Sequence, residues 1–177
     1  KFCLQCKVTR VEGNTVHYTD IEGNEQQAQG DKILMSVGRR PVLKGFGLEN
    51  IAVEIERGIK VNEVMQTSLP NVYAAGDVTG FSLLAHTASR EAEVAVNHML
   101  GIEDRMEYNA IPGVVYTNPE VSSVGLTEEQ AVKEGIEYTL HKLPMTYAGR
   151  FVAENEGQMG LCKILVAPDN KVLGVHM

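Results

Sequence analysis

The first part of the chain alternates short apolar and polar stretches, a pattern typical of strands. Turn sequences lie at 12–14 and 22–24, and an apolar run follows at 33–37. Pro41 ends this pattern, because proline cannot donate a hydrogen bond to a continuing ladder. We therefore expect residues 1–37 to form a short antiparallel meander that includes the run at 33–37.

The middle of the chain predicts a buried strand followed by the longest helix. Residues 71–75 are almost wholly apolar after Pro70, as in a strand covered on both faces. Helical spacing then extends over about 83–100, and Gly101 is a plausible C-terminal cap. The expected apolar stripe of this helix is Leu84, Ala88, Ala92, Ala95, Val96 and Met99.

The last third predicts a smaller α+β region with an antiparallel sheet. Its helix opens with the capping-box pair Thr127 and Gln130 and ends at Gly135. Its expected strands lie at 114–117, near 137–144, 150–154 and 161–166, and after a turn at 168–170. We place the boundary before this region near 108–110.

Composition narrows the possible functions. A net charge of −7 argues against nucleic acid or an anionic membrane as partner, since both select clustered basic residues. No apolar run approaches the ~20 residues of a membrane span. Three cysteines in 177 residues fit a reducing compartment, so we expect a cytoplasmic protein.

Both ends of the sequence lie in strand-like patterns. The chain opens directly at Lys1-Phe2 and closes on the apolar segment 171–177. Natural domains rarely stop inside a hydrophobic strand, because the unpaired edge exposes backbone groups. We expect both ends to be cuts in a larger protein.

Gly76 and Asp77 carry the clearest chemical signal. They follow the predicted strand at 71–75, and ligands of open α/β sheets bind beyond the carboxyl ends of strands. Gly76 would let a bulky ligand approach the backbone, and an ionised Asp77 could accept hydrogen bonds from a polyol. The helix expected from about Leu83 would add a positive dipole end. On spacing alone, an ordinary turn after a strand explains these residues equally well.

Residues 67–77, together with Leu84-Ala85-His86, strongly resemble the second flavin-binding motif of the pyridine nucleotide-disulfide oxidoreductases. The resemblance implies FAD as a cofactor, with Asp77 bound to its ribityl chain. It also implies that Gly76 and the main chain of Leu83, Leu84, Ala85 and His86 lie at the flavin. His86 would then have a positional role, and no residue of this chain a catalytic one.

The flanking segments resemble the same family. Residues 36–41 resemble the exit from its NAD-binding domain, and 2–8 resemble a strand of that domain, which implies that Gly38 and Val8 contact NAD. Residues 116–127 resemble the start of its dimerisation domain, which implies a homodimer.

The resemblance divides the chain into three parts. Residues 1–40 would end the NAD-binding domain, 41–109 would be the C-terminal part of the FAD-binding domain, and 110–177 a truncated dimerisation domain. The expected fold class is a partial Rossmann-like FAD/NAD(P)-binding α/β domain followed by an α+β domain with an antiparallel sheet.

With residues 147–151, the chain most resembles the dihydrolipoamide dehydrogenase branch of the family. This implies an enzyme that oxidises protein-bound dihydrolipoamide to lipoamide with FAD and reduces NAD. Its partner would be a lipoyl-bearing protein of a 2-oxo acid dehydrogenase or glycine cleavage complex. A relative such as a glutathione or mercuric reductase, or an NADH oxidase, remains an alternative.

Several motifs of the family are not in this sequence. It has no G-x-G-x-x-G for FAD, no C-x-x-x-x-C disulfide and no Gly-rich NAD fingerprint, and the family's His-x-x-x-x-Glu pair would lie beyond Met177. Without a thiolate pair or that base, we expect the chain alone to be inactive. An inert FAD-binding and dimerisation fragment is therefore a further alternative.

Cys3 and Cys6 form a C-x-x-C sequence that suggests a redox pair or half a zinc site. In a strand, however, residues three apart point to opposite faces, whereas a disulfide needs Cβ atoms within about 4.5 Å. No second ligand pair accompanies them, because Cys162 stands alone. We expect structural cysteines, Cys162 as a buried apolar residue, and no metal.

Overall fold

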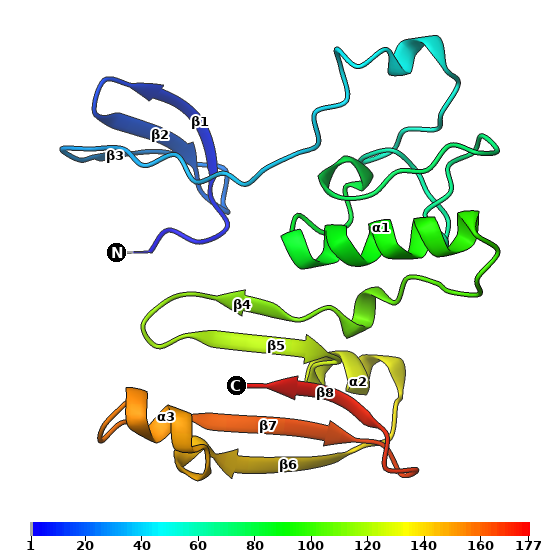
Figure 1. Cartoon of the computed structure of the whole chain (residues 1–177). Helices are drawn as coiled ribbons and strands as arrows, with labels where there is room; N and C mark the ends of the chain where they lie inside the picture. Colours follow the sequence, from blue (N-terminus) through cyan, green and yellow to red (C-terminus); the bar gives the residue numbers. More distant parts are fainter. Residues whose placement is uncertain (1) are drawn as a thin grey trace. The chain divides into compact units, whose positions relative to one another are not determined.

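A computed structural model describes residues 2–177 (Figure 1). The chain divides into two compact units, the first ending at Arg39 and the second comprising Arg40–Met177. Each unit has its own antiparallel sheet, and each is described separately below.

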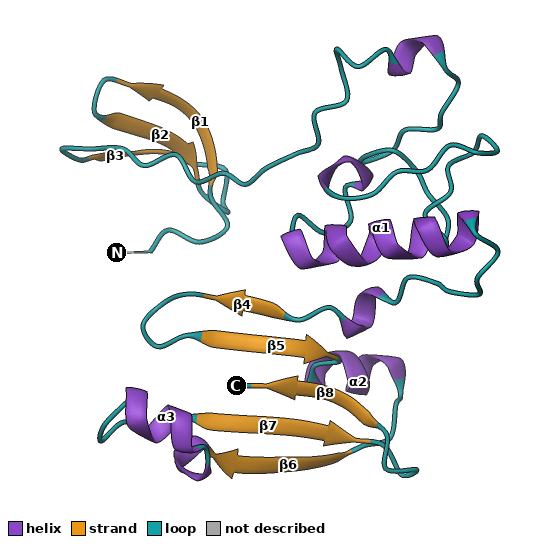
Figure 2. Ribbon diagram, viewed as in Figure 1, coloured by secondary structure: helices purple, strands orange, loops and turns teal. Residues whose placement is uncertain are grey.

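The first unit is a three-stranded antiparallel meander in the order β1-β2-β3 (Figure 2). The Asp20 carboxylate accepts hydrogen bonds from the backbone N–H groups of Glu22 and Asn24, which closes the turn between β2 and β3 and lowers the pKa of Asp20. The two predicted turns are thus confirmed. The strands are β1 (Lys7–Glu12), β2 (Thr15–Thr19) and β3 (Glu25–Gln29).

Two expectations for this unit are wrong. The apolar run at 33–37 is exposed and irregular, and the third strand is instead the polar segment 25–29. The tight turn after β2 returns the chain directly alongside it, so turn geometry outweighs hydrophobicity. The segment 2–6 is not a strand either, because the chain turns at Gln5, whose φ is 56°.

In the second unit, helix α1 (Ala85–Met99) confirms the predicted helix and its end at Gly101, which has φ 73°. Its buried face shares only Ala95 with the predicted stripe. Ala92, Val96 and Met99 are exposed. The fully buried positions are Thr87, Glu91, Val94 and Ala95. Alanine spacing predicted the helix correctly but its orientation wrongly.

The segment before α1 contains no regular strand. Residues 71–75 were expected to form one, but only an isolated bridge between Gln66 and Tyr73 is present. Short 3-10 turns occur in and after this part of the chain. These are η1 (Leu48–Asn50), η2 (Asp77–Thr79) and, after α1, η3 (Tyr108–Ala110). The small core here consists of Met65, Val94, Ala95 and Met106.

The remainder of this unit is a five-stranded antiparallel sheet in the order β4-β5-β8-β7-β6 (Figure 2). Its strands are β4 (Gly113–Val115), β5 (Val121–Gly125), β6 (Thr139–Pro144), β7 (Leu161–Val166) and β8 (Val172–His176). The predicted hairpin at 168–170 joins β7 to β8, whereas β5 was not predicted.

Two short helices lie between strands of this sheet in the sequence, one between β5 and β6 and the other between β6 and β7. The capping box of Thr127 and Gln130 is present at the start of α2 (Glu128–Glu134), which ends at Gly135 with φ 67°. Residues 150–154, expected to be a strand, belong to helix α3 (Gly149–Glu154) after the turn η4 (Met145–Tyr147). A short apolar run does not distinguish strand from helix by periodicity, and an ion pair of 2.8 Å between Arg150 and Glu154 suits the helix.

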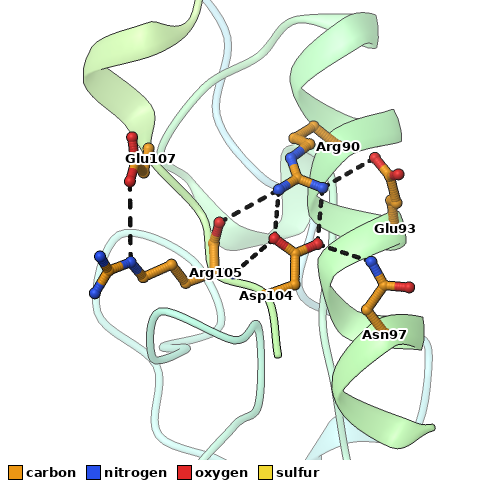
Figure 3. Close-up of polar contacts among 6 residues, drawn as sticks. All are labelled: Arg90, Glu93, Asn97, Asp104, Arg105 and Glu107. Carbon is orange, nitrogen blue, oxygen red and sulfur yellow. Dashed lines mark hydrogen bonds and ion pairs between the residues drawn. The ribbon is translucent and has the colours of Figure 1, made fainter. Parts of the chain in front are cut away.

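An ion pair attaches the chain after α1 to the helix itself (Figure 3). Both terminal nitrogens of the Arg90 guanidinium donate to the Asp104 carboxylate, at 2.8 Å and 2.5 Å. Asn97 and the backbone N–H of Arg105 also donate to this carboxylate, each at 2.8 Å. Charge-assisted and bidentate hydrogen bonds of this kind are stronger than bonds between neutral groups. Together these donors lower the pKa of Asp104 to about 2, and the bond from Arg90 is the largest cause.

No helix within residues 2–177 has the length and apolar character needed to cross a membrane.

Gly174→Ala is expected to destabilise the five-stranded sheet. Gly174 is paired with Gly125 across β5 and β8, and a Cβ at position 174 would overlap the carbonyl oxygen of Leu126. Overpacking of this kind costs about 1–3 kcal/mol, to be measured as the free energy of unfolding in urea. Gly113→Ala is the matched control, because a Cβ there meets no atom within 4 Å. Equal effects of both substitutions would contradict the proposed overlap.

Asp104→Asn is expected to reduce stability in a pH-dependent manner. The pKa of Asp104 falls from 3.8 to about 2 on folding, so its contribution is complete above about pH 4 and is lost as the pH falls towards 2. The difference in unfolding free energy between wild type and variant should therefore be constant at neutral pH and shrink between pH 4 and pH 2. Glu107→Gln, at an exposed pair with Arg105 3.9 Å away, serves as control. A difference that persists at pH 2 would argue against the ion pair as its cause.

Candidate functional site

The candidate site is built on the loop 76–84, which joins the Tyr73 bridge region to α1. Gly76 lies at its start with φ 83° and ψ −158°, a backbone conformation open essentially to glycine alone. The residue is buried, and a Cβ on it would lie 3.4 Å from the Cβ of Ala88 in α1. Gly76 is thus required by the backbone itself, in addition to any ligand that approaches it.

The buried side chain of Glu91 fixes this turn to the helix. One of its carboxylate oxygens accepts the backbone N–H of Gly76 at 2.5 Å, and the other accepts the hydroxyl of Tyr108 at 2.6 Å. The Thr79 hydroxyl donates to the Gly76 carbonyl at 2.9 Å and lies 3.4 Å from Glu91. The carboxylate therefore satisfies donors from both before and after α1 in the sequence.

Tyr108 completes this contact from the other side. Burial, followed by its hydrogen bond to Glu91, raises the pKa of the Tyr108 hydroxyl well above its ordinary value. Its ring stacks on Phe81 of the loop, with centroids 4.9 Å apart and an interplanar angle of 23°. Tyr108 thereby holds both the middle of the loop and the helix.

Backbone and hydroxyl contacts hold the rest of the loop. The N–H of Ile59 donates to the carbonyl of Val78 at 2.7 Å, and Gly58 packs against the backbone of Thr79. The hydroxyls of Ser82 and Thr87 lie 2.9 Å apart at the start of α1. These contacts leave little freedom for the backbone on either side of Asp77.

The side chain of Asp77 is the exception to this pattern of internal contacts. It is exposed, and within residues 2–177 its carboxylate takes part in no hydrogen bond or ion pair. A rigid turn therefore presents an unengaged acceptor to the surroundings. This is the arrangement that a hydroxyl-bearing ligand would require.

The start of α1 lies a few residues further on. Leu84 is its N-cap, and its side chain offers no hydrogen bond to the first-turn N–H groups. Such groups, with the helix dipole, favour an electron-rich ligand atom. The side chains of the four residues expected at the flavin edge are all exposed: Leu83, Leu84, Ala85 and His86. Nε2 of His86 lies 2.8 Å from the carbonyl oxygen of Pro112, a contact consistent with a positional role.

The two residues expected to contact NAD belong to the first unit. Val8 is exposed in β1, opposite Tyr18 in β2. Gly38 is exposed with φ 85°, and a Cβ there would meet no atom within 4 Å. The role of both residues in binding NAD stays a prediction.

The cysteines show no redox or metal arrangement. Cys3, Cys6 and Cys162 are all unbonded thiols, and within the part of the chain that the structure describes no cluster of ligating side chains could hold a metal ion. The strand geometry invoked for Cys3 and Cys6 is wrong, because they flank a turn. Cys3 Sγ lies 3.5 Å from the hydroxyl of Tyr18, and Cys162 in β7 is half-buried rather than buried.

Sequence reasoning missed Glu91 and Tyr108. The signal for Glu91 was its helical spacing from Thr87, Val94 and His98, which marks a second stripe beside the alanine-rich one. Because that stripe contains polar residues, apolar spacing alone does not mark it as a buried face. For Tyr108 no local pattern pointed to a contact with α1.

Comparisons with known proteins relate the whole chain to one family. Residues 1–95 match the family model described as pyridine nucleotide-disulphide oxidoreductase, and residues 111–177 match the dimerisation domain of the same family. "Dihydrolipoyl dehydrogenase 2, mitochondrial" from Arabidopsis thaliana is 40% identical over 185 aligned positions, covering all of this chain and 36% of the relative. "Leghemoglobin reductase" from Glycine max is 39% identical, covering all of this chain and 35% of the relative.

A solved structure agrees with these matches. LpdA from Mycobacterium tuberculosis superposes with a TM-score of 0.77 at 26% identity, covering 98% of this chain and 38% of that one. The chain thus spans little more than a third of the length of the relatives it matches. The expected fold class, part of a nucleotide-binding domain followed by a dimerisation domain with an antiparallel sheet, is confirmed. On this evidence the chain belongs to the pyridine nucleotide-disulphide oxidoreductase family.

Proposed function

We propose that this chain supplies FAD positioning and a dimer interface to a flavoprotein that oxidises protein-bound dihydrolipoamide to lipoamide and reduces NAD. The observation that carries the proposal is the exposed, unengaged carboxylate of Asp77 on a turn held rigid by buried contacts. The chain corresponds to 36% of the dihydrolipoyl dehydrogenase it resembles, so the proposed activity belongs to a longer protein of which these residues form part.

The chemistry of the residues present is compatible with a flavin dinucleotide. Asp77 would accept hydrogen bonds from ribityl hydroxyls, and Gly76 presents no side chain beside it. The main chain of Leu83, Leu84, Ala85 and His86 would border the ring, where the uncapped end of α1 favours electron density. When bound, FAD carries electrons between the dithiol and NAD, and this chain contributes orientation and electrostatics.

The first unit would contribute to the binding of NAD. Val8 would contact the dinucleotide from β1, and Gly38, which has a positive φ and no side chain, would let it approach the backbone. Neither residue carries a group that transfers a proton or an electron. Their contribution would be to affinity and orientation.

We further propose that the whole protein is a homodimer formed through residues 110–177, which fits their match to a dimerisation domain. A lipoyl-bearing protein of a 2-oxo acid dehydrogenase or glycine cleavage complex would be its substrate partner. The cytoplasmic location expected from the cysteines stays a prediction, and the Arabidopsis relative is named as mitochondrial.

A reductase with another substrate is the second candidate. It is favoured by the soybean relative, whose name specifies leghemoglobin and whose identity of 39% nearly equals that of the dihydrolipoyl dehydrogenase. The chain is about equally identical to relatives named for different substrates. We therefore infer that this part of the fold binds the cofactors common to the family and not a particular substrate. Substrate choice would then depend on residues elsewhere in the protein.

Asp77→Ala in the full-length protein is expected to weaken FAD binding. Loss of hydrogen bonds to a charged group costs about 1.5–3 kcal/mol, or roughly 10- to 150-fold in Kd. Reconstitution of the apoprotein, followed by flavin fluorescence, measures this change. Asp31→Ala, at an exposed acid of the first unit, is the control. Unchanged affinity on substitution of Asp77 would refute its assignment as a ribityl ligand.

The isolated 177-residue chain is expected to show no turnover of dihydrolipoamide with NAD, because it carries no C-x-x-x-x-C pair and no residue assigned as acid or base. Formation of NADH, followed by absorbance, tests this, with the full-length protein as positive control. The inert-fragment alternative makes the same prediction for the chain but none for the longer protein. Measurable turnover by the chain would show that the expectation is wrong.

A further inference from the structure

Glu91 is a buried acid without a basic partner. Its side chain has no exposed area, and within residues 2–177 no Lys, Arg or His nitrogen lies within ion-pair distance of it. The neighbouring Arg90 points to Asp104 instead (Figure 3). A carboxylate removed from water is costly unless hydrogen bonds replace its hydration, so its two short bonds are its main compensation.

These two bonds reach residues with separate roles. The N–H of Gly76 belongs to the peptide directly before Asp77, and the hydroxyl of Tyr108 belongs to the segment that leads to β4. Gly76 has no side chain to pack, so its backbone is held by the bond from its N–H to Glu91 and by the Thr79 hydroxyl that donates to its carbonyl. The direction of the Asp77 side chain depends on the orientation of this backbone.

We propose that Glu91 is a positioning residue for the flavin, which aims the carboxylate of Asp77 by fixing the Gly76 peptide. This inference rests on the proposed FAD site and extends it to a side chain that does not touch the ligand. Tyr108 contributes to the same positioning, because its hydroxyl donates to the Glu91 carboxylate and its ring stacks on Phe81 of the loop. Through Tyr108, the loop 76–84 is connected to the segment that precedes β4 of the five-stranded sheet.

Substitutions of Glu91 separate geometry from charge. In Glu91→Gln, the amide oxygen can accept the Gly76 N–H while the amide nitrogen donates to the Tyr108 oxygen, so both contacts can be retained. In Glu91→Asp, the charge remains but the side chain is one methylene shorter and cannot reach both partners. Tyr108→Phe removes the hydrogen bond between Tyr108 and Glu91 with little change in side-chain shape.

The test uses the full-length protein with FAD. The measurements are the Kd for FAD from flavin fluorescence, the visible circular dichroism of the bound flavin, which reports its asymmetric surroundings, and the thermal midpoint. Leu165→Ala is the control for general destabilisation, because Leu165 is fully buried in β7 and does not take part in the loop contacts.

We expect Glu91→Asp to weaken FAD binding about tenfold and alter the visible circular dichroism, as for a lost hydrogen bond to a buried group. Glu91→Gln should stay within about threefold of wild type. Tyr108→Phe should alter the visible circular dichroism, whereas Leu165→Ala should lower the thermal midpoint and leave both flavin measurements unchanged.

Three results would overturn the inference. One is a folded Glu91→Asp variant with unchanged Kd and visible circular dichroism. Another is the reverse order, with Glu91→Gln impaired and Glu91→Asp normal, which would indicate a role of charge alone. The third is equal weakening by Leu165→Ala, which would indicate general stability. If Asp77→Ala also left FAD affinity unchanged, the proposed FAD site would fail, whereas an effect at Asp77 without one at Glu91 would refute this inference only.

Discussion

The structure around the candidate site depends on one buried carboxylate. Glu91 satisfies a donor from the loop before α1 and a donor from the segment after it. An unbonded charge in the interior would cost several kcal/mol, so neither donor can leave without a large penalty. Helix, loop and following segment therefore form one cooperative piece, although only four residues make up the main apolar cluster here.

A second polar contact extends this piece towards the sheet. Arg90 and Glu91 are adjacent in sequence, and each has a different partner after the helix, since Arg90 contacts Asp104 and Glu91 contacts Tyr108. Both partners lie within five residues of each other in the segment after α1. Helix α1 therefore contacts the segment 104–108 through a partly exposed ion pair and through a hydrogen bond to the buried carboxylate of Glu91. Together these contacts position the chain that leads into β4.

Sequence patterns predicted the parts of the fold that depend on local chemistry. The capping box at Thr127, the hairpin at 168–170 and the length of α1 each follow from residues a few positions apart. The errors concern contacts between distant segments. The buried face of α1 is set by Gly76 and Tyr108, and the third strand of the meander by its turn, so neither could be read from apolar spacing. At the site, the resemblance identified exposed candidates such as Asp77 but not the interior residue that holds them.

The exposure of Asp77 has a consequence for how substitutions are tolerated. Because its side chain makes no internal contact within the described residues, replacing it should leave the fold intact, whereas Gly76 and Glu91 are constrained by the backbone and the interior. Selection for folded, abundant protein would therefore retain Gly76 and Glu91 and would be blind to Asp77. Only selection for ligand binding would retain Asp77. Comparing variants selected for folding with variants selected for ligand binding would therefore distinguish the residues that maintain the structure of the site from the residue that contacts the ligand.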